Sequence, residues 1–418
     1  MRRELDQSLD ATTPATQQPR GLYVKTFGCQ MNEYDTEKVC SLLAGDYRVV
    51  DDPSRAEVAF VNTCSVREKG EHKLFSLLGK LRMLKEEHPQ LIVGVGGCVA
   101  QQEGERILQA NDAVDFVVGT HNLSLIPSLV ASARRGLRRQ VAVDYRDEWE
   151  ELPDAFLPLD EDPQSNPFDP VRALVAIQRG CNKHCAFCVV PRTRGAEVSR
   201  SPDEIEREVR LKVRLGAKEV LLLGQTVNSY GRDLSPRYPF ETLIRRLAAI
   251  DGLHRIRFTS PHPADVRPGF IELYQDIPQL CRHIHLPLQS GSDRILKEMN
   301  RNYRTRRYLE IVDSLRQACP ELAISTDLIV GFPTESDAEF IQTLEMMEKV
   351  QFFSSFSFKY SIRPNTVAKD RYRDEELIPE DVASARLEQL QTVQKQLSLK
   401  HHQRLMGTDV EVLVEGRR

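Results

Sequence analysis

The stretch ALVAIQRGCNKHCAFC, residues 173–188, places three cysteines immediately after a short apolar run. Residues 173–177 predict a buried strand, and Cys181, Cys185 and Cys188 follow it with the spacing CxxxCxxC. Thiolates this close together can hold one metal centre, and cysteine suits zinc or an iron–sulfur cluster. Three thiolates would leave one iron of a four-iron cluster without a protein ligand, and such an open position is where a substrate or cofactor binds.

Apolar runs alternate with amphipathic segments from residue 172 onward, a pattern typical of repeated β/α units. Six units are too few for a closed eight-fold barrel and predict an open, partial one. The cysteine motif would then lie at the C-terminal rim, where such folds place their active sites. The predicted strands are residues 173–177, 219–223, 255–259, 283–288, 322–329 and 353–360, and the predicted helices are 202–215, 240–250, 303–318, 337–350 and 379–405.

The region before this barrel, residues 21–139, alternates in the same way and predicts a doubly wound parallel sheet. The predicted strands are residues 22–27, 56–61, 91–95 and 114–118, and the predicted helices are 33–43, 68–85 and 101–109.

A second set of three cysteines comes from this first region. Cys29, Cys64 and Cys98 are 35 and 34 residues apart, and each directly follows a predicted strand. The C-terminal ends of parallel strands share one edge of a sheet, the edge where ligands bind. The three thiolates are therefore expected to converge, again one short of a closed four-cysteine site. The remaining cysteines occupy no such position and are assigned to packing: Cys40, Cys281 and Cys319.

Composition divides the chain further. The N-terminal residues are polar and lack the apolar core of a secretory signal, which indicates a disordered lead-in. An acidic, proline-rich segment that carries the only tryptophan, Trp149, indicates a linker. Near the C-terminus, residues 410–414 alternate as a strand does and predict the start of a small β domain. The predicted parts are a lead-in at 1–20, an α/β domain at 21–140, a linker at 141–170, the barrel at 171–406 and the β domain at 407–418.

Charge and hydropathy limit where the protein acts. The net charge is −4, so a nucleic-acid site would have to be local. No run of eighteen apolar residues exists, which argues against a membrane span. A cytoplasmic protein keeps its thiols reduced, so the nine cysteines are expected to be ligands or packing residues rather than disulfides.

The two cysteine sets and their flanking residues closely resemble the bacterial tRNA methylthiotransferases of the radical S-adenosylmethionine superfamily. The resemblance covers about residues 21–418. It implies an N-terminal methylthiotransferase domain, a radical core and a C-terminal TRAM domain for RNA, of which only the first strand would be present. The matching stretches are FGCQMNEYD (27–35), NTCSVRE (62–68), GGCVAQ (96–101) and CVVPRTRG (188–195).

This resemblance also implies cofactors and a reaction. Cys181, Cys185 and Cys188 would hold a 4Fe-4S cluster that binds S-adenosylmethionine, and the earlier three cysteines a second 4Fe-4S cluster that carries the sulfur. Two S-adenosylmethionine molecules would be used to methylthiolate C2 of N6-dimethylallyladenosine beside the tRNA anticodon. Adenine C2–H is neither acidic nor electrophilic, so a cofactor must carry the difficult step. The implied partners are this modified tRNA and a flavodoxin-type reductant, and the chain is expected to be a monomer.

Further site residues follow from position and resemblance. Phe187, the aromatic residue before the last cysteine of the motif, matches the superfamily pattern. Gly224 and Gln225 end the second barrel strand and Gln289 ends the fourth, so all are candidate cofactor contacts on the rim. Arginines near an active site suit phosphate groups, although an exposed solvated face is an equally good interpretation. The candidate RNA contacts are Arg192, Arg194, Arg301 and Arg304.

Other functions remain open at this stage. A structural zinc site is disfavoured because two-cysteine knuckles normally come in pairs and no second one follows the motif. Methylthiotransferases that act on ribosomal protein S12 or on threonylcarbamoyladenosine differ in the residues after the first cysteine, where this chain has Gln30 and Met31. A non-catalytic iron–sulfur scaffold that binds RNA or ferries sulfur need not cleave S-adenosylmethionine, so the intact CxxxCxxC motif together with the rim motifs argues against it.

Overall fold

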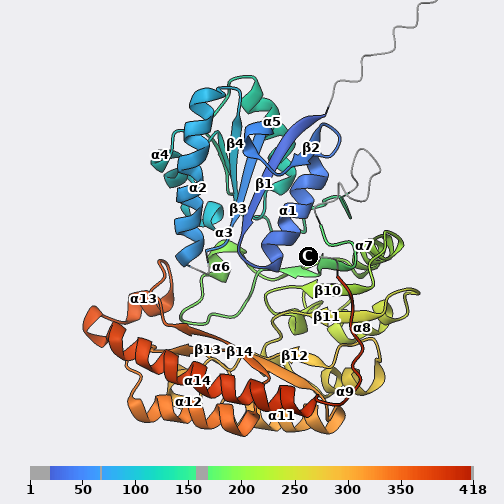
Figure 1. Ribbon diagram of the computed structural model, residues 1–418, viewed down its shortest axis with the longest axis vertical. Coiled ribbons are helices and arrows are strands. Elements are labelled where there is room, and N and C mark those ends of the chain that lie inside the picture. The colour runs from blue at the N-terminus through green and yellow to red at the C-terminus, as the bar shows by residue number, and fades with distance from the viewer. Residues whose placement is uncertain (1–18, 66–67, 157–167, 416–418) are drawn as a thin grey trace, which may run out of the picture.

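The computed structural model describes residues 19–65, 68–156 and 168–415 and confirms the predicted α/β fold class. An N-terminal unit with one parallel sheet is stacked on a second unit that contains a partial barrel (Figure 1). Most of the predicted lead-in and residues 157–167 of the predicted linker lie outside the described residues.

The N-terminal unit contains six parallel strands. They are β1 (Arg20–Phe27), β2 (Tyr47–Val50), β3 (Val58–Thr63), β4 (Ile92–Gly97), β5 (Phe116–Val118) and β6 (Gln140–Ala142). The helices are α1 (Gln30–Leu43), α2 (Glu68–Glu87), α3 (Cys98–Glu103), α4 (Glu105–Ala110) and α5 (Ile126–Arg134). The strand order is β2-β1-β3-β4-β5-β6, so the chain winds outward from β1 in both directions.

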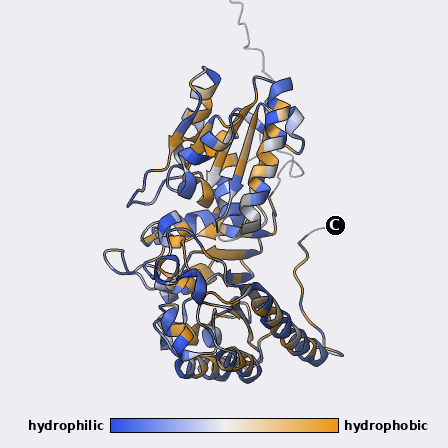
Figure 2. Cartoon of the chain, turned by 90° about the vertical axis from the view of Figure 1, so that its left-hand side faces the viewer, coloured by the Kyte–Doolittle hydropathy of each residue, from blue (hydrophilic) through white to orange (hydrophobic). Residues whose placement is uncertain are grey.

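Helices cover both faces of this sheet. α1 and α5 pack on one face around Phe60 and Phe116, and α2 and α4 pack on the other face around Val61 and Val95. Every residue of β3, β4 and β5 is buried, as expected for strands of a doubly covered parallel sheet. Figure 2 shows hydrophobic residues concentrated along the strands.

The second unit is a barrel that does not close. Its strands are β7 (Arg172–Ala176), β8 (Gln178–Arg179), β9 (Val198–Ser199), β10 (Glu219–Leu223), β11 (Arg255–Phe258), β12 (His283–His285), β13 (Ala323–Val330) and β14 (Ser354–Lys359). Its helices are α6 (Val190–Thr193), α7 (Pro202–Arg214), α8 (Phe240–Ala248), α9 (Pro268–Asp276), α10 (Asp293–Glu298), α11 (Thr305–Ala318), α12 (Asp337–Val350), α13 (Val367–Arg371) and α14 (Glu380–Arg404). Two three-stranded parallel sheets, β11-β10-β7 and β12-β13-β14, are joined by a parallel bridge between Ile256 and Leu280, which leaves β7 and β14 at the two open edges.

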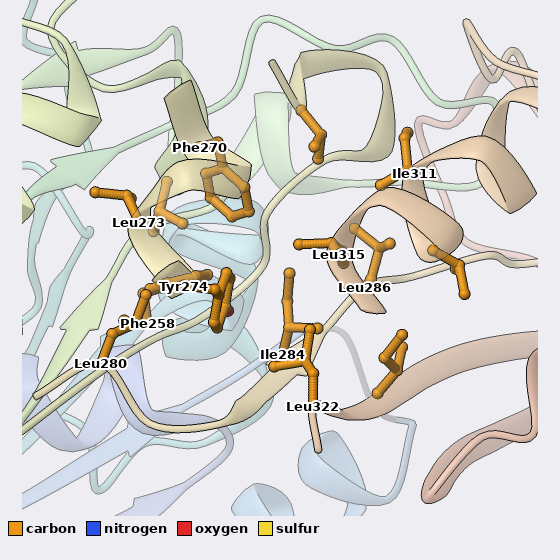
Figure 3. Packing of buried hydrophobic residues seen from close by; sticks show 14 of the residues in the cluster. Phe258, Phe270, Leu273, Tyr274, Leu280, Ile284, Leu286, Ile311, Leu315 and Leu322 are labelled. Carbon is orange, nitrogen blue, oxygen red and sulfur yellow. The ribbon is translucent and has the colours of Figure 1, made fainter. Parts of the chain in front are cut away.

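One hydrophobic core holds the barrel together. Side chains from α9 and α11 gather over the strand residues Phe258 and Ile284 (Figure 3). Phe258 and Phe270 meet edge to face, with ring centroids 5.5 Å apart, a preferred aromatic geometry. The helices on the outside of the barrel therefore fix the strands whose C-terminal ends carry the site.

A buried network of charges joins the two units. Lys38 of α1 lies 2.7 Å from Glu208 of α7, and both side chains are almost inaccessible to solvent. Lys212 pairs with Glu37 at 2.7 Å, and Arg200 also contacts Glu208. Burial alone would raise the pKa of Glu208, but Lys38, Lys212 and Arg200 outweigh it and lower that pKa to about 2. Removing one partner of such a network costs on the order of 3–5 kcal/mol, so it resists separation of the units.

Two segments show clear differences from the sequence prediction. The single helix predicted over residues 101–109 is two short helices, because Gly104 between them has φ of +47°. The strand predicted at residues 410–414 is wrong: these residues form no strand, and Val410, Val412 and Val414 are exposed. A strand without neighbours has nothing to pair with its backbone groups. Glu411 instead contacts Arg255 at 3.0 Å. Within the described ranges, no helix is long and apolar enough to cross a bilayer.

Candidate functional site

The structure brings Cys29, Cys64 and Cys98 together at one edge of the N-terminal sheet. They follow β1, β3 and β4, three strands that are neighbours in the sheet. Cys29 precedes α1 at its N-cap and Cys98 is the first residue of α3. The Cys64 thiol lies within hydrogen-bonding reach of both other thiols.

Glycines allow this close approach. A Cβ on Gly28 would lie 2.6 Å from the Cys64 Cβ. Gly97, with φ of +92°, would place a Cβ 2.4 Å from the Thr63 carbonyl oxygen, and this backbone conformation also favours glycine. The glycines before Cys29 and Cys98 are therefore needed for the cysteine backbones to pack.

Two buried asparagines support the same edge. Asn32 donates from Nδ2 to Asn62 Oδ1 at 3.0 Å, and Asn62 donates back to the Asn32 carbonyl at 2.8 Å. The Cys29 thiol donates to Asn32 Oδ1 at 3.4 Å. The prediction placed β3 too early because Asn62 and Thr63 are polar, yet both are fully buried members of the strand.

An arginine from the second unit reaches this cysteine set. Arg194 is 4% exposed and lies 2.6 Å from Asp35 of α1. Hydrogen bonding with Cys64 and, more weakly, the charge of Arg194 lower the pKa of Cys98 to about 6 despite burial. The hydrogen bond from Cys64 and, more weakly, Arg194 also lower the pKa of Cys29 to about 7. Both shifts are in the direction that favours the thiolate, the form of cysteine that binds metals.

The second set, Cys181, Cys185 and Cys188, lies on the loop between β8 and α6. The backbone N–H of Lys183 donates to Cys181 Sγ at 3.4 Å, and that of Val190 donates to Cys188 Sγ at 3.5 Å. Donors aimed at sulfur stabilise a thiolate. Burial raises the pKa of Cys188 to about 12, so a metal must displace its proton on binding.

The loop is held from the opposite side of the barrel. Ala186 donates its N–H to the Met299 carbonyl at 3.0 Å and accepts one from Ala368 at 2.8 Å. Arg301 places Nη1 3.5 Å from Cys185 Sγ, and its guanidinium lies 5.5 Å from the ring centroid of Phe187. Phe187 thus packs beside the cysteine loop.

The predicted cofactor contacts lie on the same rim. Gly224 and Gln225 follow β10 directly, and the next residue, Thr226, places its hydroxyl 3.3 Å from Cys181 Sγ. The Gln225 Oε1 atom is buried and has no hydrogen-bond partner within the described part of the chain. Gln289 is buried with a left-handed φ of 75°. A buried acceptor without a partner beside a cysteine loop fits a site built for an additional polar group.

The four arginines predicted to contact RNA separate into two pairs. Arg192 is exposed, and Arg304 is half-buried with its guanidinium on the carbonyl oxygens of Arg301 and Tyr303. Arg194 and Arg301 are buried against the two cysteine sets, each beside a thiol. Their guanidinium groups are not available to RNA phosphates, which corrects the prediction for this second pair.

Sequence reasoning missed the inner face of the barrel's second half. His285 lies 3.3 Å from Asp327 and meets the ring of Phe356 edge to face. In the sheet register, Asp327 pairs with Phe356 and Ile329 with Phe358, so all four share one side of the sheet. Phe356 and Phe358 are exposed. The alternating serines and phenylalanines of SSFSFK were a visible signal of a strand with one apolar face.

The arrangement of side chains bears on whether the cysteines could bind a single metal ion or a cluster. No group of three or more His, Cys, Asp or Glu side chains among the described residues is arranged to hold one metal ion. The ligands of a cluster bind different irons and need not converge on one point. Two sets of three thiols, each with hydrogen-bond donors to sulfur, therefore fit iron–sulfur clusters in the chemistry of their donors.

Family comparisons match each unit. The pattern of the radical SAM superfamily matches residues 175–347, which include the second cysteine set. That of an uncharacterized protein family, UPF0004, matches residues 21–119, which include the first.

Similar proteins of known name extend over nearly the whole chain. The tRNA-2-methylthio-N(6)-dimethylallyladenosine synthase of Geobacter metallireducens is 48% identical over 399 residues, which is 94% of this chain and 87% of that protein. The protein of the same name from Syntrophobacter fumaroxidans is 47% identical over 417 residues, 98% of this chain and 87% of its own length.

Solved structures share the fold at low identity. The radical S-adenosylmethionine methyltransferase TsrM from Kitasatospora setae, with cobalamin and a 4Fe-4S cluster bound, aligns with a TM-score of 0.60 at 12% identity, over 84% of this chain and 74% of TsrM. The cobalamin-dependent S-adenosylmethionine radical enzyme OxsB aligns with a TM-score of 0.58 at 11% identity, over 90% of this chain and 56% of OxsB.

Proposed function

Because the chain belongs to the family of tRNA-2-methylthio-N(6)-dimethylallyladenosine synthases, we propose that its two sets of three cysteines are the ligands of the two 4Fe-4S clusters that such an enzyme uses. The enzyme is a radical S-adenosylmethionine methylthiotransferase, and its substrate is tRNA that bears dimethylallyladenosine. The relatives favour this substrate over ribosomal protein S12 and over threonylcarbamoyladenosine.

The observation that carries the proposal is the number and position of the thiols. Each set contains three cysteine thiols that follow strands of its own unit. Neither set has a fourth cysteine within the described ranges. The bound clusters and S-adenosylmethionine supply the one-electron chemistry that an unactivated C–H bond requires. The remaining cysteines lie in the packed body of the protein: Cys40, Cys281 and Cys319.

The protein's own residues prepare the two sites. Backbone N–H groups donate to the sulfurs of Cys181 and Cys188, an interaction that favours their thiolates. We propose that the polar groups of S-adenosylmethionine bind along the rim. Gln225 Oε1, which has no partner within the described residues, would accept one hydrogen bond, and Gly224 would let the cofactor approach the backbone closely. Gln289 and Phe187 complete this rim.

The target base has a candidate position on the inner face of the second half-barrel. Phe356 and Phe358 present exposed rings there, and an apolar N6 substituent and a purine ring are groups that such rings bind well. Asp327 lies within electrostatic range of Arg301, whose Nη1 is 3.5 Å from Cys185 Sγ, so this face lies near the cysteine loop. We propose that the dimethylallyladenosine enters the open barrel between these rings and the rim.

The remaining interactions follow from this function. Arg192 and Arg304 are the proposed contacts to the tRNA backbone, and their contribution should fall with rising salt. A flavodoxin-type reductant, a monomeric state and a cytoplasmic location suit a tRNA-modifying enzyme that needs reducing power. The proposed domains are residues 21–140 and 171–406, connected by the segment at 141–170, except that strand β1 of the first unit begins at Arg20 and strand β6 extends to Ala142.

Iron content tests the ligand assignment directly. Anaerobic reconstitution of the full chain should give about eight irons and eight sulfides per chain, if both clusters are of the four-iron type. Colorimetric iron and sulfide counts on monodisperse protein measure this. Saturation near four irons, or stoichiometric zinc, would show that one of the two sets is not a cluster site.

The aromatic face has its own test. Phe356→Ala should raise the apparent Kd for dimethylallyl-modified tRNA roughly 5- to 150-fold, the equivalent of the ~1–3 kcal/mol that stacking on one base contributes. Binding to tRNA without the dimethylallyl group should change less. Phe75→Ala, which removes an exposed ring from α2, is the matched control. Equal effects on both tRNAs would place the rings outside the base site.

A further inference from the structure

One short segment of the chain connects the two cysteine sets. Cys188 ends the CxxxCxxC motif, α6 follows at once, and Arg194 directly after α6 is six residues from Cys188. Although it belongs to the barrel unit, its guanidinium lies in the N-terminal unit, 2.6 Å from Asp35. Asp35 lies on α1, the helix that begins after Cys29.

The backbone around Arg194 is fixed on both sides. Thr120 donates its hydroxyl to the Thr193 carbonyl at 2.7 Å. Gly195, with φ of +73°, packs so closely on His121 that a Cβ would lie 3.0 Å from the ring carbon Cε1. Helix α3, which begins with Cys98, packs against α6. Arg194 is therefore held as part of the first cysteine site and cannot swing to the surface.

We propose that Arg194 is a positioning residue for the first cluster, where its charge, held by Asp35 beside the first cysteine set, sets the reduction potential of that cluster. The inference rests on the proposed function only in taking Cys29, Cys64 and Cys98 as cluster ligands. It also explains why Arg194 closely follows the CxxxCxxC loop in the sequence. When that loop docks on the N-terminal unit, Arg194 becomes part of the surroundings of the first cluster.

The sign of the effect follows from electrostatics. One electron from a reductant such as dithionite makes the net charge of the cluster one unit more negative. A buried guanidinium stabilises this reduced form, because the surroundings screen its charge poorly. Arg194→Gln should therefore shift the potential to a more negative value. Asp35→Asn removes the carboxylate that neutralises the arginine, so it should shift the potential to a more positive value.

The experiment isolates the first cluster in the full chain by replacing Cys181, Cys185 and Cys188 with alanine. Dithionite titration followed by electron paramagnetic resonance then measures the midpoint potential in this background and in Arg194→Gln, Asp35→Asn and Arg194→Lys. Arg192→Gln, which removes an exposed charge two residues away, is the control and should leave the potential unchanged. We expect opposite shifts for Arg194→Gln and Asp35→Asn, with Arg194→Lys close to the parent.

Each outcome decides between alternatives. An Arg194→Gln potential equal to that of Arg192→Gln, or shifts of the same sign for Arg194→Gln and Asp35→Asn, would overturn the proposal. If Arg194→Gln fails to retain iron, retention by Arg194→Lys supports a requirement for the charge, and loss in both overturns it. A background variant without any cluster would instead refute the ligand assignment, which is the proposed function rather than this inference.

Discussion

Replacing Cys188 with alanine is expected to abolish both cleavage of S-adenosylmethionine and methylthiolation, to the limit of detection. The site has three thiols and its loop is held so that Cys188 Sγ receives the N–H of Val190. Two thiolates cannot hold a four-iron cluster in place of three, and no other described cysteine lies on this loop. Anaerobic assay of 5′-deoxyadenosine and of methylthiolated nucleoside by mass spectrometry measures both losses, with iron falling to about four per chain.

The control for this change is a cysteine of the barrel that carries no chemistry. Cys319 follows α11 and is buried in the barrel core, outside both site loops. Cys319→Ala should cost on the order of 1 kcal/mol of unfolding free energy through a small cavity and leave both activities intact. Retained cleavage in Cys188→Ala would mean that the CxxxCxxC loop does not hold the cluster that binds S-adenosylmethionine.

The sequence predicted the fold well where burial produces a regular pattern of apolar residues along a strand or helix. The six parallel strands of the barrel were placed within a few residues, because each is an apolar run, whereas the short antiparallel pair β8 and β9 was not predicted. Where backbone chemistry or exposure affects a strand, the predicted strand ends were displaced or the strand was missed. The fourth strand ends at His285 rather than at residue 288, because Pro287 cannot donate to the ladder. Edge strands β2 and β6 were missed because they are only half-buried and short.

The cysteines of both sites could be predicted because topology relates residues that are far apart in sequence. Parallel strands bring their C-terminal ends together, and three cysteines at such ends need no local motif. The arginines could not be assigned in the same way. Arg192 and Arg194 are two residues apart in one basic stretch, yet the first is exposed and the second is buried beside Cys98. Arg194 is buried and Arg192 exposed only because the two units dock against each other. Hydrophobic periodicity in the sequence gives no information about such docking.

Replacing Cys98 with alanine should separate the two reactions. Cys98 begins α3 in the N-terminal unit, so its loss leaves Cys181, Cys185 and Cys188 and the backbone donors of their loop in place. Reductive cleavage of S-adenosylmethionine should therefore persist, while methylthiolated tRNA should be absent. The measurement is the ratio of 5′-deoxyadenosine to methylthio product under identical reducing conditions, where the wild-type protein forms both.

Cys40→Ala makes the result specific to the ligand position. Cys40 lies in the same unit, on α1, and is buried in the core rather than at the sheet edge. Its variant should lose about 1 kcal/mol of unfolding free energy and keep both products. Methylthiolated product from Cys98→Ala would contradict the assignment of the first cysteine set. Loss of cleavage as well would show that the two clusters do not act independently, a coupling for which the Arg194 segment is the structural path.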